Sequence, residues 1–134
     1  MTATYRVLIA DKIAADGLAP LREDSRFELI TKPGLSLPDL TQALTEVDAV
    51  IVRSAAKVPR EAMSATTRLK VIGRAGVGVD TIDVDAATEK GIAVLNAPAG
   101  NTISAAELTM ALMLSLARRV AAAVRDLGLT HAVI

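Results

Sequence analysis

The sequence has no cysteine and no tryptophan, and it has one tyrosine, one phenylalanine and one histidine. The lack of cysteine excludes disulfides, thiolate metal sites and a catalytic thiol, and it agrees with a reducing compartment. Sites that stack bases, flavins or sugars usually use several aromatic rings, so Tyr5 and Phe27 alone argue against such ligands. The position of His131 in the C-terminal tail indicates a surface residue and not a general base. One histidine also leaves little for a metal site, and we predict none.

An excess of charge of either sign is also missing. The sequence has 15 Lys and Arg against 15 Asp and Glu, a formal net charge of +0, and these residues are scattered. Proteins that bind nucleic acid or anionic membranes usually carry a clustered basic surface. We therefore expect neither partner.

Long apolar runs are absent as well. The longest uncharged stretch without glycine or proline covers residues 108–117, which is shorter than the roughly 20 residues of a membrane-spanning helix. The N-terminus lacks the apolar segment of a signal peptide. The sequence therefore predicts a soluble, cytoplasmic protein.

What the sequence does contain is aliphatic: 134 residues, of which 51% are hydrophobic. This length and composition suit one compact domain, and no repeat or low-complexity linker divides it. Short β-rich runs alternate with Ala- and Leu-rich helical stretches, which is typical of βαβ units around a parallel sheet. We predict a three-layer α/β/α domain. Its five strands are expected at residues 5–9, 27–30, 49–52, 69–72 and 92–95.

Several helix ends can be read directly. Ser36, followed by Pro38 and Asp39, predicts a helix start, and Pro59 predicts another. Gly91 is expected to follow the last residue of a helix at 84–90. Three acids just before and within the start of that helix are expected to cap it and to balance its dipole. These are Asp80, Asp83 and Asp85.

The strongest helix prediction is the last one. Ser104 and Glu107 have the spacing of a capping box, and residues 108–117 leave almost no polar face. A helix that is apolar around most of its circumference needs cover on several sides. We therefore expect a neighbour or a partner subunit on the helix, which is predicted to cover residues 101–124. Residues 121–134 form either a sixth edge strand or a loose tail, and the pattern leaves both open.

Ligands of parallel α/β sheets bind beyond the carboxyl ends of the strands. The run from Gly73 to Gly78 follows the fourth predicted strand and contains three glycines, which permit positive φ and allow several N–H groups to face an anion. The same glycines also suit a tight turn from strand to helix, and both interpretations stay open. The run matches neither a Rossmann fingerprint nor a phosphate-binding P-loop.

Two arginines accompany this loop. Arg53 follows the third strand and Arg74 follows the fourth, and their guanidinium groups match a carboxylate or a phosphate. Asn101 and Thr102 precede the last helix, where N–H groups favour negative charge. An arginine at a strand end is also common in surface ion pairs. The residues together indicate an anion pocket, with no base, nucleophile or metal cluster beside it.

Two other classes that share this architecture do not fit. A phosphoreceiver domain needs an aspartate after the third strand, where this sequence has Arg53. A flavodoxin needs a hydroxyl-rich phosphate loop after the first strand, where Asp11, Lys12 and Ile13 stand, and it needs aromatic walls.

Four segments carry a resemblance to a known family. They are residues 50–54 (VIVRS), 69–80 (LKVIGRAGVGVD), 91–98 (GIAVLNAP) and 100–108 (GNTISAAEL). These segments resemble the first domain of the D-isomer 2-hydroxyacid dehydrogenases, in particular of the members that oxidise 3-phosphoglycerate. The resemblance covers residues 1–120, whereas 121–134 diverge. It implies a flavodoxin-like substrate-binding domain with strand order 2-1-3-4-5.

The resemblance also implies roles for individual residues. Arg53 and Ser54 would lie near the phosphate or carboxylate of the substrate, and Asn101 would lie at the cleft. The substrate carboxylate would meet the loop that consists of Arg74, Ala75, Gly76 and Val77. Val77 would also lie close to the nicotinamide of NAD, the family's cofactor.

The family's NAD-binding Rossmann domain and its catalytic Arg, Glu and His would lie beyond residue 134. We therefore expect the substrate-binding half of such an enzyme, which binds 3-phosphoglycerate weakly, binds no NAD by itself and is inactive alone. The alternative is a structural fragment without ligand function that forms a homodimer through residues 101–124.

Overall fold

The structure is a computed structural model, and it describes residues 4–128. The chain forms two compact units, Met1–Gly100 and Asn101–Ile134. The first unit contains nine elements. They are β1 (Tyr5–Ile9), α1 (Ala15–Glu23), β2 (Phe27–Thr31), α2 (Leu37–Leu44), β3 (Ala49–Val52), the 3₁₀ turn η1 (Arg60–Met63), β4 (Val71–Arg74), α3 (Val84–Glu89) and β5 (Ala93–Asn96).

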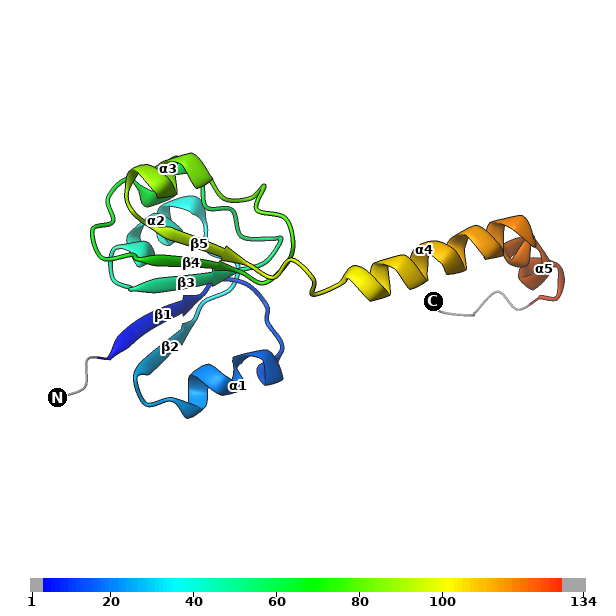
Figure 1. The fold of residues 1–134 in the computed structure, drawn as a ribbon, viewed down its shortest axis with the longest axis horizontal. Coiled ribbons are helices and arrows are strands. Elements are labelled where there is room, and N and C mark those ends of the chain that lie inside the picture. Colours follow the sequence, from blue (N-terminus) through cyan, green and yellow to red (C-terminus); the bar gives the residue numbers. More distant parts are fainter. Residues whose placement is uncertain (1–3, 129–134) are drawn as a thin grey trace. The chain divides into compact units, whose positions relative to one another are not determined.

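The five strands form one parallel sheet in the order β2-β1-β3-β4-β5. This confirms the predicted α/β class and strand order. In Figure 1, α2 and α3 lie on one side of the sheet and α1 lies on the other. The strands are thus the middle layer, as a parallel sheet with crossover helices requires.

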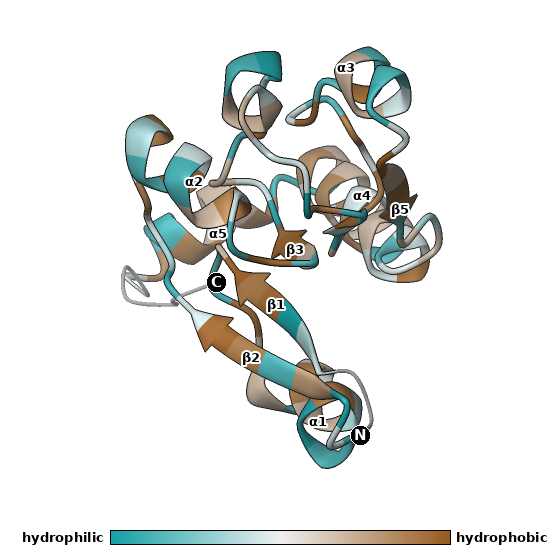
Figure 2. Cartoon of the chain, turned by 90° about the vertical axis from the view of Figure 1, so that its left-hand side faces the viewer, coloured by the Kyte–Doolittle hydropathy of each residue, from teal (hydrophilic) through white to brown (hydrophobic). Residues whose placement is uncertain are grey.

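The core lies mainly on the side of α2 and α3. Alternate strand residues, including Leu8, Val50 and Ile72, are fully buried there against Leu44 and Met63. A smaller cluster on the other side joins Val7, Ile9 and Leu18 of α1. Figure 2 shows the resulting distribution: β3 is largely hydrophobic, whereas hydrophilic residues lie on α2 and α3.

Two predicted strands begin later in the structure. The predicted strand at 69–72 is β4 at Val71–Arg74, and the one at 92–95 is β5 at Ala93–Asn96. Leu69 is buried, but its N–H donates to Thr66 Oγ1 and not to a neighbouring strand. Its apolar character therefore reflects core packing, and Gly73 and Arg74 are strand residues instead of loop residues.

The predicted helix ends have mixed outcomes. Ser36 Oγ accepts from the N–H of Asp39, Asp83 accepts from that of Ala86 at 2.8 Å, and Gly91 has φ +68°. These three predictions are confirmed. The helix expected after Pro59 is only the short 3₁₀ turn η1, with Pro59 as its N-cap residue.

The second unit contains α4 (Thr102–Ala117) and α5 (Val120–Asp126). The predicted capping box is wrong: α4 begins at Thr102, and Ser104 Oγ donates to the carbonyl of Asn101 at 3.1 Å. A single helix over 101–124 is also wrong, because Arg119 has left-handed geometry (φ 54°) between α4 and α5.

Part of the predicted tail, residues 121–126, is therefore helical. The edge strand predicted as its alternative, and His131, fall outside the described residues. Among the described helices none is long and apolar enough to cross a membrane.

Candidate functional site

The carboxyl ends of β3, β4 and β5 lie side by side. The strand register pairs Val52 with Arg74 and Arg74 with Asn96. The next residues continue this pairing, because Ala75 N–H donates to the carbonyl of Val52 at 2.8 Å and Ala97 N–H donates to that of Gly76 at 2.9 Å. The segments singled out in the sequence thus meet at one edge of the sheet.

Arg53 and Ser54 line an open cavity of about 450 Å³ at this edge, which we call the Arg53 cavity. Its other lining residues are Asp11, Lys12, Pro33, Gly34 and Ala55. The side chains of Lys12, Arg53 and Ser54 are all exposed. Two cationic groups and a hydroxyl beside an open cavity suit a small anion.

The backbone of the Arg53 cavity is held by Asp11, which follows β1. One oxygen of its carboxylate, Oδ2, accepts from the N–H of Arg53 at 2.8 Å and from that of Ala56 at 2.9 Å. Arg53 Nη1 in turn donates to the carbonyl of Lys12 at 3.4 Å. Each of the two segments, after β1 and after β3, thus accepts or donates hydrogen bonds that link it to the other.

Asp11 is 7% exposed and ionised. Burial alone raises the pKa of its carboxyl, but the N–H groups of Ala56 and Arg53 and the charge of Arg53 outweigh burial, so the pKa is lowered from its usual 3.8. The negative charge is therefore balanced within the protein at neutral pH.

Arg74 and Ala75 line a different cavity, of about 270 Å³, which we call the Arg74 cavity. Its wall is mainly apolar and includes Leu18, Leu95 and Asn96. Arg74 Nη1 donates to the carbonyl of Ala75 at 3.1 Å, while its Nε is buried without a hydrogen-bond partner. The two predicted arginines therefore lie at the same sheet edge but line separate cavities.

The glycine loop differs from the prediction. Among the described glycines, positive φ occurs at 34, 91 and 128 and not at 73, 76 or 78. The N–H groups of Ala75 and Gly76 donate to backbone carbonyls. Of the two interpretations left open, the nest of positive-φ glycines is therefore wrong. Gly76 instead leaves room for its neighbour, since a Cβ there would overlap Nη1 of Arg74.

The loop is closed by a residue that the sequence analysis did not single out. Asn96 Nδ2 donates to the carbonyl of Val77 at 2.7 Å. The Val77 side chain is 42% exposed. One apolar side chain does not hold a dinucleotide, and the following helix begins only at Val84, too late to place its N–H groups at this loop. The residues described here do not fit a complete NAD site.

Asn101 belongs to the second unit. It is the N-cap residue of α4, and its side chain makes no capping hydrogen bond to the helix. Its predicted place at the substrate cleft stays a prediction.

Asp11 and Lys12 were also missed as site residues. The rule that directs attention to the carboxyl ends of parallel strands applies to β1 as well, and these residues follow β1 directly. The signal was thus present in the sequence. Only the partner of Asp11, a backbone N–H more than 40 residues away, requires the fold.

With the fold and the cavities established, the comparisons define the class. A family model described as "D-isomer specific 2-hydroxyacid dehydrogenase, catalytic domain" matches residues 7–132. The chain therefore belongs to the D-isomer specific 2-hydroxyacid dehydrogenases, and the resemblance seen in the sequence is confirmed.

Curated relatives are D-3-phosphoglycerate dehydrogenases. The chain is 48% identical over 116 residues to that of Bacillus subtilis, covering 87% of this chain and 22% of the relative. It is 47% identical over 122 residues to that of Methanocaldococcus jannaschii, covering 91% of this chain and 23% of the relative. The chain thus spans about a fifth of the length of these proteins.

Solved structures agree with the fold. The TT0316 protein of Thermus thermophilus aligns with a TM-score of 0.78 at 36% identity, over 96% of this chain and 42% of that one. The NAD⁺-bound 3-phosphoglycerate dehydrogenase of Entamoeba histolytica aligns with a TM-score of 0.73 at 28% identity, over 84% of this chain and 39% of that one.

Proposed function

We propose that this chain is the substrate-recognising part of a D-3-phosphoglycerate dehydrogenase, and that the Arg53 cavity binds the phosphate or carboxylate of 3-phosphoglycerate. One observation carries the proposal: in a chain 48% identical to such an enzyme, Lys12, Arg53 and Ser54 surround an open cavity at the carboxyl edge of the sheet. In the whole enzyme the reaction would be the oxidation of 3-phosphoglycerate to 3-phosphohydroxypyruvate with NAD.

In this proposal the site residues bind and orient the substrate. The guanidinium group of Arg53 donates two parallel hydrogen bonds to an oxyanion, while Lys12 adds a point charge and Ser54 a hydroxyl donor. Holding the anionic end of the substrate fixes the position of its reacting carbon. Arg74 and the loop to Val77 are proposed to meet the substrate carboxylate from the neighbouring Arg74 cavity.

Isothermal titration of this chain with 3-phosphoglycerate tests the proposal. We expect saturable binding in the micromolar to millimolar range, and we expect Arg53→Ala to weaken it by about tenfold or more, because a hydrogen bond to a charged group contributes roughly 1.5–3 kcal/mol. Arg22→Ala is the matched control, since Arg22 is exposed at the end of α1 and lines neither cavity. Absence of saturable binding at millimolar ligand would refute a preformed site.

A second titration with NAD, and an assay for NADH with both ligands present, separates binding from turnover. We expect no NAD binding, because the described residues do not fit a complete dinucleotide site, and we expect no NADH, because hydride transfer needs a bound dinucleotide as acceptor and a base for the substrate's hydroxyl proton. NADH formation by these 134 residues would contradict a purely substrate-binding role.

A second candidate function is self-association through the second unit. Within that unit α4 buries no side chain, and Leu112 and Leu116 are 60% and 82% exposed. Residues 108–117 carry no charge. A second copy of this chain offers the same apolar surface in return.

Sedimentation velocity over a range of concentrations tests this candidate. We expect a dimer, and we expect Leu112→Glu to shift it towards monomer because the dimer would bury a charge. Val84→Glu is the control, because Val84 is an exposed apolar residue of α3 in the first unit. Monomers only, at the highest concentration, would exclude self-association.

A further inference from the structure

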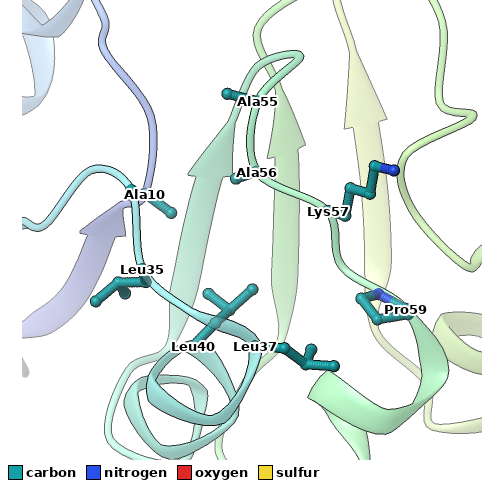
Figure 3. A pocket seen from close by; sticks show the side chains of 9 residues that line it. Ala10, Leu35, Leu37, Leu40, Ala55, Ala56, Lys57 and Pro59 are labelled. Carbon is teal, nitrogen blue, oxygen red and sulfur yellow. The ribbon is translucent and has the colours of Figure 1, made fainter.

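Two cavities adjoin the loop that carries Arg53 and Ser54. Arg53, Ser54 and Ala55 line the Arg53 cavity. Ala55, Ala56 and Lys57 line a second cavity of about 330 Å³, opposite Leu37 and Leu40 of α2. Figure 3 shows this second cavity with Leu35, Leu37 and Leu40 at its base and the loop above it. Ala56 packs against the hydrophobic core, whereas Arg53, Ser54, Ala55 and Lys57 are exposed beside the two cavities, so packing fixes the loop mainly at one residue.

The hydrogen bonds that do fix the loop come from one group. Within the described residues, the backbone N–H groups of 53–57 that donate a hydrogen bond are those of Arg53 and Ala56, and both donate to Asp11 Oδ2. The anchor itself is rigid, because Asp11 directly follows Ala10, whose N–H donates to the carbonyl of Ile51 in β3. Asp11 thus ties a largely exposed loop to the sheet.

This arrangement is unexpected for an anion site, because the carboxylate of Asp11 lines the same cavity as Lys12 and Arg53. A carboxylate that acted only through its charge would repel a bound anion. The geometry gives it another role, because its hydrogen bonds determine where the backbone of Arg53 lies.

We infer that Asp11 is a positioning residue for anion binding: its carboxylate holds residues 53–56 in the conformation in which Arg53 and Ser54 face the Arg53 cavity. The inference rests on the function proposed above and adds a residue that binds no ligand itself. It also makes opposite predictions for two substitutions. Asp11→Ala removes the acceptor, whereas Asp11→Asn removes the charge and keeps an oxygen at the same place.

The test is titration of the full chain and its variants with 3-phosphoglycerate. We expect Asp11→Ala to bind about tenfold more weakly, because the loop that presents Arg53 loses both of its backbone hydrogen bonds. We expect Asp11→Asn to bind at least as tightly as the unchanged chain. If the carboxylate acted through charge alone, both variants would bind more tightly, which would overturn the inference.

Asp48 provides the matched control at the opposite edge of the sheet. Like Asp11, Asp48 accepts a hydrogen bond from a distant backbone N–H: its Oδ2 accepts from the N–H of Arg6 at 2.8 Å, next to the pairing of β1 and β3. Asp48→Ala is therefore expected to lower stability but to leave affinity for 3-phosphoglycerate unchanged. Equal loss of affinity in both alanine variants would show that Asp11 acts through general stability.

A double-mutant cycle shows whether Asp11 acts through Arg53. In the Arg53→Ala background, Asp11→Ala is expected to cost clearly less affinity than it does in the unchanged chain, since Ser54 is then the remaining cavity group that Asp11 positions. Additive losses would overturn the inference.

Amide hydrogen exchange gives a readout that does not depend on ligand. The N–H groups of Arg53 and Ala56 are expected to exchange faster in Asp11→Ala than in the unchanged chain and to stay protected in Asp11→Asn. Unchanged exchange in Asp11→Ala overturns the inference. If Asp11→Ala does not fold, the Asn variant decides through the same two readouts, with lost protection or weaker binding counting against the inference.

If the unchanged chain binds no 3-phosphoglycerate, the proposed function fails and this inference fails with it. If the chain binds and Asp11→Ala binds equally well, the inference alone fails.

Discussion

At the scale of single residues, Gly76 matters because it leaves space for the side chain of Arg74. Its own backbone does not require glycine, as the following observations show. Arg74 donates to the carbonyl of Ala75, and its guanidinium group lies against Gly76. Gly76 has no positive φ. The absence of a side chain at Gly76 therefore leaves the space that the guanidinium group of Arg74 occupies.

Gly76→Ala is expected to displace the guanidinium group of Arg74 with little loss of stability, because the end of a flexible side chain yields more easily than backbone. The free energy of unfolding should change by less than about 1 kcal/mol. The Nε–H resonance of Arg74 reports the displacement. Gly78→Ala is the control, as its Cβ would meet Asp80 Oδ1 instead; an unmoved Arg74 resonance in Gly76→Ala would contradict this role.

Asp11 and Asp48 contribute to the acid sensitivity of the fold, beside Asp24 and Glu89, whose pKa values neighbouring arginines also lower. Arg68 and the N–H of Arg6 lower the pKa of Asp48, and backbone N–H groups lower that of Asp11 despite its burial. A pKa that is lower in the folded than in the unfolded chain stabilises above the unfolded value of 3.8. That stability is lost as pH falls through the folded pKa.

Urea denaturation between about pH 6 and pH 2 checks this expectation. Stability should fall on the acid side in the unchanged chain, and it should fall less steeply in Asp11→Asn and in Asp48→Asn, which have no carboxyl to protonate. Identical acid limbs in all three proteins would show that neither carboxylate contributes.

The sequence indicated the residue types of the site better than their contacts. Arg53 and Ser54 were found because they follow a strand. The partnership of Asp11 with Arg53 N–H joins positions that no local pattern connects. The glycines at 73, 76 and 78 left open both a positive-φ nest and a tight turn; none of them has positive φ, and close side chains at 76 and 78 use the space instead.

At the scale of elements, the sequence predicts helix ends that a capping side chain or a positive-φ glycine determines. It does not predict the ends of helices and strands that core packing determines. Ser36 and Asp83 cap their helices as expected. Leu69 reads as a strand residue because it is apolar, but it packs in the core before β4 begins. The Ser104–Glu107 pattern failed because the helix was already under way at Thr102.

Two glycines in the same unit should respond in opposite ways to alanine. Gly91 has φ +68°, so Gly91→Ala is expected to lower the free energy of unfolding by about 1 kcal/mol. Gly17 lies within α1 with its Cβ position 3.7 Å from Ile13, so Gly17→Ala should raise that free energy by about 0.5–1 kcal/mol. Thermal or urea denaturation measures both, and a stabilising Gly91→Ala would contradict the assigned helix end.

At the scale of the whole molecule, alternation of apolar runs and helices was enough to predict the α/β class, because each strand of a parallel sheet needs a crossover. The strand order came from the family resemblance, and the sheet confirms it. The break at Arg119 was not predictable, because Arg118 and Arg119 are good helix formers that connect two runs of apolar and alanine residues, and such a sequence favours one continuous helix.

The central claim is that the Arg53 cavity binds the anionic end of 3-phosphoglycerate. The most direct measurement is a two-dimensional ¹⁵N NMR titration of this chain with that ligand. We predict saturable shifts at the amides of Lys12, Arg53 and Ser54, and none at Asp48 and Lys70 on the opposite edge of the sheet. Absent shifts, or shifts that spare the Arg53 cavity, would contradict the claim.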